Sequence, residues 1–401
     1  MKKVLIWGAG YYAEYVYDVI DKKICTIEGI IDSDKKKQGM LWKEKLLIYS
    51  PEEINNLEFD KIIVSVKEYI SVEAKAKELY IPENKIIFYW KDSESQGIFE
   101  NRALRILQEK QEKEIYKNRF ESAPYEWGLK KVPMIYSDEK LLKRIIKDGS
   151  SLSRFGDGEF EIMQGRKRPW FQKPSVSLQK RLIEVMDSKL VNLNIAIAQN
   201  FMFLDQYKED VADGIRAYMS NGNRESIINF LPNREFYNAY VTRPYIMYKE
   251  KNHAERIFLL FKRVWEGRTI ILVEGKYARI GVGNDLFQGA KSLKRILCPS
   301  QETWNNYEEI KAAVLENVKK NDLICISLGP TATVLAYDLA CQGFQALDIG
   351  QLDNEYEWFL ANAKERINIK GKMVAELYDY YNGGEFENNV YESQIIQRIG
   401  N

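Results

Sequence analysis

The chain has 401 residues, a length that predicts two or three domains. Its 59 Lys and Arg residues balance 58 Asp and Glu residues, so no overall field favours nucleic acid or an anionic membrane surface. The single histidine, His253, excludes zinc sites built from several histidines. We therefore expect a bound metal to be magnesium or manganese held by oxygen ligands, and a general base to be a carboxylate.

Cysteine usage and hydropathy predict a soluble, cytoplasmic chain. The four cysteines form no Cys-x-x-Cys pair and lack the dense spacing of secreted disulfide proteins. The apolar runs are too short for a signal peptide, which needs about 7–15 apolar residues, or for a membrane span, which needs about 20.

The first 92 residues alternate between short apolar runs and helical patterns. Strands that alternate with helices form parallel sheets with right-handed crossovers. The pattern therefore predicts a small Rossmann-like domain of the nucleotide-binding type over residues 1–92. Its predicted strands are Lys3–Trp7, Ile27–Ile31, Lys61–Val66 and Lys85–Tyr89.

A glycine-rich turn follows the first of these strands. Gly8 and Gly10 begin a Gly-x-Gly-x-x-Ala pattern, and Asp32 ends the next strand about 20 residues later. In dinucleotide-binding domains such glycines let the backbone approach a pyrophosphate, and the acid binds a ribose hydroxyl. Because Tyr11 and Tyr12 are bulky beside that position, two interpretations stay open. One is a bound nucleotide, with NAD possible but not expected, and the other is a degenerate unit retained for assembly.

The rest of the chain divides into a connector, a second domain and a tail. Residues 93–136 are rich in charged residues and predict a helical connector, with its helix over Ala103–Arg119. Strands and helices alternate again over 137–385, which predicts a second parallel α/β domain, and 386–401 form a polar tail. The strands expected in this domain are Asn194–Ala198, Thr269–Val273, Arg295–Cys298, Leu323–Ser327 and Ala346–Ile349.

The segment from Arg154 to Glu159 has the residue types of a metal site. Asp157 and Glu159 are separated by one glycine, and the neighbouring glycines allow a tight turn in which both carboxylates reach one divalent cation. Arg154 is suited to neutralising phosphate oxygens beside that cation. Taken alone, two acids in a turn are more often a solvated loop.

This segment belongs to a series of stretches that resembles the GT-D-fold glycosyltransferases. That bacterial family was first catalogued as a domain of unknown function and is linked to adhesin glycosylation. The matching stretches span about residues 137–380. They are Ser153-Arg-Phe-Gly-Asp-Gly-Glu159, Thr242-Arg-Pro-Tyr245, Val273-Glu-Gly275, Arg279-Ile-Gly-Val-Gly-Asn-Asp-Leu-Phe287, Arg295-Ile-Leu-Cys-Pro-Ser300, Leu328-Gly-Pro-Thr-Ala-Thr-Val-Leu-Ala-Tyr-Asp338, Asp348-Ile-Gly350 and Glu355-Tyr-Glu-Trp358.

The resemblance implies a GT-D-like second domain that transfers a sugar from a nucleotide diphosphate sugar, with Asp157 and Glu159 as its metal motif. A divalent cation on the diphosphate stabilises the charge that develops on the leaving nucleotide. The substrate-binding residues that we assign on this basis are Arg154, Arg243, Glu274, Arg279, Asn284, Asp285, Gly329, Thr331, Thr333 and Asp348.

Two turns in this set also suit an anion for physical reasons. The turn from Leu328 to Thr333 lies between a predicted strand and a predicted helix, where backbone amides and hydroxyls can hold phosphate. Arg279 with Gly281 and Gly283 forms a second candidate. For this second turn, a flexible surface loop is an equal alternative.

The acceptor hydroxyl needs a base, and a carboxylate is expected. Glu376 matches an acidic position near the end of the family and is our first choice, with Glu355 and Glu357 as alternatives. Where the family has a histidine directly after Asp-Ile-Gly, this chain has Gln351, which would weaken the site or shift its selectivity. His253 lies in a charged segment and is expected to be solvated. Trp170 is a candidate platform for stacking a sugar.

We therefore predict a metal-dependent hexosyltransferase with Mn²⁺ or Mg²⁺ as cofactor and a UDP-hexose as the expected donor. The acceptor would be a cell-surface glycan precursor or a glycoprotein, and a homodimer or a glycosylation complex is compatible with this function. We expect no nucleic-acid partner. Two alternatives stay open: an NAD-linked sugar oxidoreductase or epimerase acting through the first domain, and a non-catalytic assembly factor that binds a sugar nucleotide.

Overall fold

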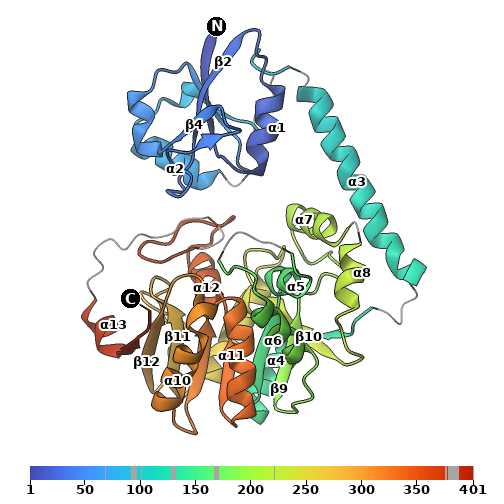
Figure 1. Cartoon of the computed structure of the whole chain (residues 1–401), viewed down its shortest axis with the longest axis vertical. Coiled ribbons are helices and arrows are strands. Elements are labelled where there is room, and N and C mark those ends of the chain that lie inside the picture. The colour runs from blue at the N-terminus through green and yellow to red at the C-terminus, as the bar shows by residue number, and fades with distance from the viewer. Residues whose placement is uncertain are drawn as a thin grey trace. The chain divides into compact units, whose positions relative to one another are not determined.

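The computed structural model describes residues 1–67, 69–91, 97–100, 102–127, 132–166, 171–220, 222–374, 377 and 388–400. The chain divides into two compact units, one containing Met1–Glu114 and the other containing Ile115–Ala363 and Ile369–Met373. Each unit is built on its own sheet (Figure 1). The predicted charged connector contains helix α3 (Arg102–Trp127).

The first unit has a six-stranded sheet in the order β3-β4-β2-β1-β5-β6, in which only the β3–β4 pair is antiparallel. The strand order reverses between β1 and β5, as in Rossmann folds. Val4 and Ile6 pack on one face of β1, and Leu5 and Trp7 pack on the other. The elements are β1 (Lys2–Trp7), α1 (Tyr11–Val19), β2 (Cys25–Ile31), β3 (Leu41–Trp42), β4 (Leu46–Tyr49), β5 (Lys61–Val64), α2 (Ile70–Glu78) and β6 (Ile86–Phe88).

The second unit has a nine-stranded sheet in the order β15-β12-β11-β13-β14-β8-β9-β10-β7, with every pair parallel. The two parallel-dominated sheets confirm the predicted α/β fold class. The strands are β7 (Ile135–Tyr136), β8 (Ser151–Phe155), β9 (Leu193–Ile197), β10 (Phe236–Asn238), β11 (Thr269–Gly275), β12 (Ser292–Cys298), β13 (Leu323–Ser327), β14 (Gln345–Asp348) and β15 (Ile395–Arg398).

Helices cover this sheet, and α6, α10 and α11 lie in front of it in Figure 1. Helix α11 packs against β8, β14 and α6, and α4 packs against α9 and β10. The helices are α4 (Asp138–Asp148), α5 (Asp157–Met163), α6 (Val176–Met186), α7 (Glu209–Met219), α8 (Asn223–Ile228), α9 (Asn252–Val264), α10 (Tyr307–Asn317), α11 (Pro330–Cys341), α12 (Leu352–Leu360) and α13 (Asn389–Gln394).

The strand order gathers the predicted motifs at one edge of the second sheet. The order reverses between β8 and β14 and again between β11 and β13, so that β11, β13, β14 and β8 are four consecutive strands. Ligands of parallel sheets bind outside the carboxyl ends of the strands at such reversals. We call the carboxyl ends of these four strands the carboxyl edge.

Two segments differ from the sequence-based expectation. Ser151–Phe155 forms a central strand although it has no apolar run, because its polar groups are satisfied inside the fold: the Ser153 hydroxyl donates to the Thr333 backbone oxygen at 2.8 Å. The region treated as a polar tail contributes β15, which pairs with β12, and Ile399 beyond it is buried.

Candidate active site

Asp157 and Glu159 lie at the start of helix α5, directly after strand β8 ends. Gly156 is the N-cap residue, and its backbone N–H donates to Glu159 Oε2 at 2.8 Å, which turns that carboxylate back toward the strand. Asp157 occupies the first helical position and is exposed. The two acids therefore belong to a helix start instead of the open turn expected from the sequence, and both lie at the carboxyl edge.

Arg154, near the end of β8, is bonded to the end of the neighbouring strand β14. Its Nη2 donates to Asp348 Oδ1 at 2.7 Å, and its Nε donates to the Asp348 backbone oxygen at 2.8 Å. Gly350 permits this approach, because it has a φ of +47° and a Cβ at its position would collide with the Arg154 guanidinium. The structure thus brings two predicted substrate residues together and makes each the partner of the other.

Burial shifts the pKa values of the acids at this edge in the same direction. It raises the pKa of Glu159 to about 7, and the negative charge of Asp348 adds to this shift while the Gly156 N–H opposes it. Burial also raises the pKa of Asp348, with Arg154 acting in the opposite sense. A cation bound here would compensate the lost hydration of both carboxylates.

Asn200 and Tyr240 lie beside Asp157, although the sequence analysis did not single them out. The Tyr240 hydroxyl donates to Asn200 Oδ1 at 2.9 Å. Burial raises the pKa of Tyr240 to about 12, with a contribution from the charge of Asp157. Asn200 also lines a small hollow together with Asp157. Both residues come just after strands, β9 and β10 respectively, and that position is the signal that could have marked them.

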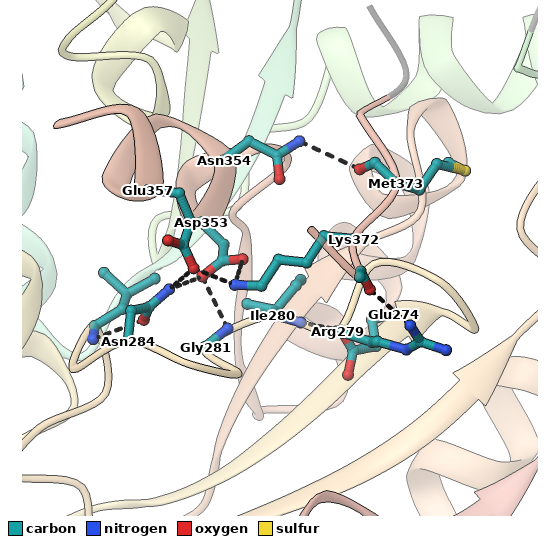
Figure 2. Close-up of polar contacts among 12 residues, drawn as sticks. Glu274, Arg279, Ile280, Gly281, Asn284, Asp353, Asn354, Glu357, Lys372 and Met373 are labelled. Carbon is teal, nitrogen blue, oxygen red and sulfur yellow. Dashed lines mark hydrogen bonds and ion pairs between the residues drawn. The ribbon is translucent and has the colours of Figure 1, made fainter. Parts of the chain in front are cut away.

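A polar network fixes the loop that follows β11 (Figure 2). Lys372 Nζ donates to Asp353 Oδ2 and to Glu357 Oε1, each at 2.7 Å. Asn284 Nδ2 donates to the same two carboxylates at 2.8 and 2.7 Å, and the Gly281 N–H donates to Asp353 at 2.9 Å. We call these five residues the lysine network. It joins the loop after β11, the start of α12 and the segment Ile369–Met373.

Two further predicted substrate residues support the same loop. Glu274 is fully buried, forms an ion pair with Arg295 and accepts the Ile280 N–H at 2.7 Å. Arg279 donates from Nη1 to the Gly371 backbone oxygen at 2.7 Å (Figure 2). Both side chains therefore bind other groups of the protein in this conformation. Their contact with a substrate stays a prediction.

The turn between β13 and α11 packs against other segments of the second unit. Thr331 and Thr333 are fully buried, and the Thr333 hydroxyl donates to the Arg154 backbone oxygen at 2.9 Å. Gly329 has a φ of +57°, and the ring of Phe171 lies 2.7 Å from the position that a Cβ would take. The three predicted residues of this turn shape the carboxyl edge through internal contacts, so phosphate binding by them stays a prediction.

Asp285 and Arg243 lie on either side of this edge. Asp285 is exposed and accepts from Lys262 Nζ at 2.7 Å and from the Tyr356 hydroxyl at 2.6 Å. The hydrogen bond from Lys262 is the largest cause of its lowered pKa. Arg243 is partly exposed and donates its backbone N–H to Tyr240 at 2.7 Å. Its charge acts on the Tyr240 hydroxyl, as does that of Asp157.

Two of the three candidate bases lie among the described residues. Glu355 is buried, and its Oε2 accepts the backbone N–H groups of Tyr245 and Ile246, each at 2.9 Å. This carboxylate anchors the segment after β10. Glu376 lies outside the described residues, as does Trp170. The assignment of the base therefore stays a prediction.

Oxygen ligands suited to a divalent cation are present at the ends of β8 and β14. They are the carboxylates of Asp157, Glu159 and Asp348, together with Gln351 Oε1, which is buried and has no hydrogen-bond donor among the described residues. Within the described part of the chain, no three acidic, His or Cys side chains are close enough to enclose an ion. The chemistry of these oxygens fits magnesium or manganese, whereas a compact ligand shell is not preformed.

His253 is half-buried instead of solvated, so the sequence-based expectation is wrong. Its Nε2 lies 2.9 Å from Asp138 Oδ2, and its ring lies 5.0 Å from that of Tyr248. Asp138 is only 3% exposed, and a buried carboxylate needs a hydrogen-bond donor. The only histidine of the chain is therefore explained by packing beside α4.

In the first unit, the predicted nucleotide-binding residues form a closed turn. Gly8 has a φ of +112° and packs against Ser65, while Gly10 faces open space. Asp32 Oδ2 accepts the Ala9 N–H at 2.7 Å, so this acid supports the turn itself. Binding of a nucleotide in this unit stays a prediction.

Comparison with known families decides what the second unit is. The family model described as "Glycosyltransferase GT-D fold" matches residues 152–377, which is more than half of the chain. The chain belongs to the GT-D glycosyltransferases. Glycosyltransferases act on a sugar donor and an acceptor, and the carboxyl edge of this chain is the candidate site for them. The first unit matches a different model, "C2185-like, N-terminal", over residues 1–87.

This GT-D glycosyltransferase is similar to two curated streptococcal proteins. It is 35% identical over 267 residues to "Probable glycosyl transferase Gly" of Streptococcus gordonii, a match that covers 66% of this chain and 39% of that protein. It is 36% identical over 269 residues to "Glycosyltransferase GlyD" of Streptococcus pneumoniae, a match that covers 66% of this chain and 32% of that protein. The matched part thus spans less than two-fifths of the length of either relative.

Solved structures confirm the GT-D fold. One, described as domain of unknown function 1792 with a distinct glycosyltransferase fold, is 34% identical with a TM-score of 0.63 and covers 68% of this chain and 97% of its own. A glycosyltransferase of the same domain family from Streptococcus sanguinis is 34% identical with a TM-score of 0.62. This match covers 67% of this chain and 100% of the chain in that structure. No helix in the described part of the chain has the length and apolar character to cross a membrane.

Proposed function

We propose that this GT-D glycosyltransferase transfers a hexose from a UDP-linked donor and uses Mn²⁺ or Mg²⁺. The observation that carries the proposal is the placement of Asp157 and Glu159 at the end of β8, next to the strand that ends in Asp348. Carboxylate oxygens at a reversal of strand order suit a divalent cation that carries a diphosphate, although these three acids do not form a closed ligand shell in this conformation.

The residues of this edge would divide the work of holding the metal. Asp157 is exposed and would face the bound donor, whereas Glu159 and Asp348 are held by the Gly156 N–H and by Arg154. Gln351 Oε1 adds a buried acceptor that needs a partner. When bound, the metal supplies charge stabilisation for the departing nucleoside diphosphate.

The diphosphate also needs cationic or N–H donors from the protein. Arg154 and Arg279 donate to protein oxygens. Arg243 is partly exposed, and its charge acts on the same Tyr240 hydroxyl as the charge of Asp157. We assign Arg243, together with Arg154 and Arg279, to the basic residues that would contact the diphosphate beside the metal.

The acceptor in this proposal is a cell-surface glycan precursor or a glycoprotein. Support comes from the resemblance to a family linked to adhesin glycosylation. The acceptor hydroxyl would lose its proton to a carboxylate, with Glu376 as the proposed base.

Titration of the chain with UDP, followed by calorimetry, tests the proposal. With Mn²⁺ we expect binding that weakens at least tenfold when EDTA replaces the metal, because the acids at the ends of β8 and β14 repel a bare diphosphate. Equal affinity for UDP with Mn²⁺ and with EDTA would contradict the proposal.

A further inference from the structure

We infer that the hollow beside Asp157 receives the methyl group of an acetamido sugar and that Asn200 binds the amide of the same substituent. The inference rests on the proposed function, since it assigns a sugar-recognition element to the same site.

The hollow lies between α5, the segment after β9, and the helices α7 and α8. Its room suffices for about one group the size of a water or a methyl. Three of its lining residues are polar: Asp157, Asn200 and Tyr218. The other five are apolar: Phe160, Ala198, Phe201, Met219 and Ile227.

These walls favour a methyl group over a hydroxyl. A hydroxyl or water enclosed by apolar side chains loses hydrogen bonds that the walls cannot replace. A methyl group in the same place gains van der Waals contacts and is transferred out of water. This transfer increases the binding affinity by about fourfold. The hydroxyl groups of a plain hexose would gain no such contact from the hollow.

Asn200 makes the acetamido group the best match among methyl-bearing substituents. Its Oδ1 accepts the Tyr240 hydroxyl at 2.9 Å, which fixes the orientation of the amide and directs the Nδ2 donor away from Tyr240. An acetamido carbonyl would accept from that Nδ2 while its methyl enters the hollow. A 6-deoxy sugar has the methyl group but no carbonyl, so it would satisfy the hollow and leave Asn200 unpaired.

The acetamido sugar can enter on the donor or as the acceptor, and separate assays distinguish these sources. In the donor arm, hydrolysis of UDP-GlcNAc is compared with that of UDP-Glc and of the N-propanoyl analogue, without acceptor and with Mn²⁺. In the acceptor arm, methyl glycosides of GlcNAc, Glc and the 6-deoxy sugar fucose are compared as ligands by saturation-transfer NMR, which observes the methyl protons directly. The acetamido compound should be preferred at least tenfold in one arm, and the longer N-propanoyl group should lose about tenfold or more.

Ala198→Val places extra carbon in the hollow and should reduce the ratio of acetamido to glucose substrate at least fivefold. Ala217→Val is the matched control, because Ala217 is exposed on α7 and does not line the hollow. Thermal melts of both variants report on folding, and the ratio is independent of the amount of folded protein.

The outcomes separate this inference from the proposed function. A preference for the acetamido compound that Ala198→Val removes and Ala217→Val preserves supports the inference. Equal use of both sugars, a ratio unchanged in Ala198→Val, or a stronger signal from the 6-deoxy sugar overturns it. If no UDP-sugar is hydrolysed, the proposed function fails. The methyl signal of the GlcNAc glycoside, present in the wild type and absent in Ala198→Val, then still decides the inference.

Discussion

Arg154 and Asp348 are joined by two hydrogen bonds, one to the carboxylate at 2.7 Å and one to the backbone oxygen at 2.8 Å. The pair joins β8 to β14 at the reversal of strand order. The charges of both residues act on the nearby Glu159 carboxyl group. Arg154 thereby supplies one positive charge from the protein itself beside the buried acids of this edge.

Removal of that charge should cost stability as well as activity. Arg154→Met leaves Asp348 buried without its partner, and we expect a loss of about 3 kcal/mol in the free energy of unfolding. Asp348→Asn in the same background should recover part of that loss, since no uncompensated carboxylate remains. Urea unfolding of both variants measures the effect, and equal stability of the single and double variants would show that the pair carries no such charge coupling.

Gly350 should tolerate no side chain. Its φ of +47° and its closeness to the Arg154 guanidinium both oppose a Cβ. Gly350→Ala should therefore destabilise the fold by more than about 2 kcal/mol. Gly343 is the control, because it has a φ of +83° with open space around it, and Gly343→Ala should cost only about 1 kcal/mol. Similar losses for both glycines in thermal melts would argue against the collision.

The lysine network should hold the loop after β11 in place. Lys372→Met leaves Asp353 and Glu357 without their cation, and we expect a loss of about 3–5 kcal/mol together with faster amide exchange at Gly281. Lys370 lies two positions earlier and is exposed, so Lys370→Met serves as the control. Unchanged exchange at Gly281 in Lys372→Met would mean that the loop is held by other contacts.

Lys251 should make stability depend on pH in the alkaline range. Burial, helped by the charge of Lys208, lowers the pKa of Lys251 from 10.5 to about 8. Between about pH 8 and 10.5 the unfolded state therefore binds more protons than the folded state, and stability contributed by this group rises with pH. We expect a rise of about 1–2 kcal/mol that is absent in Lys251→Met, measured as the difference between the two proteins in urea unfolding at each pH. Parallel pH profiles would contradict it.

The strands with continuous apolar runs could be predicted closely, and β13 has the bounds expected from Leu323–Ser327. Strand β8 could not be predicted in this way, because Ser153 and Arg154 are residue types typical of a surface. Their hydrogen-bond partners come from α11 and β14, which are distant in the sequence. The pattern Asp157-x-Glu159 could be assigned to a metal motif only through family resemblance. Its sequence does not reveal that a Gly156 N-cap makes it the start of a helix.

The rest of the site depends on contacts between distant parts of the chain. Asn200 and Tyr240 are 40 residues apart and meet because β8, β9 and β10 are neighbours in the sheet. Lys372 reaches Asp353 only because Ile369–Met373 returns to the loop after β11, where the Met373 N–H donates to Tyr277. No local pattern in the sequence encodes either meeting.

Hydrolysis of a UDP-hexose in the presence of Mn²⁺, compared between the wild type, Asp157→Asn and Glu159→Gln, tests the central claim most directly. Glu225→Gln, an exposed acid on α8, is the control for loss of a negative charge. We predict that both site variants stay folded and lose at least 100-fold in kcat/KM, because each removes a metal ligand, while the control keeps its rate. Wild-type rates in folded Asp157→Asn and Glu159→Gln would contradict the assignment of these two carboxylates to the metal.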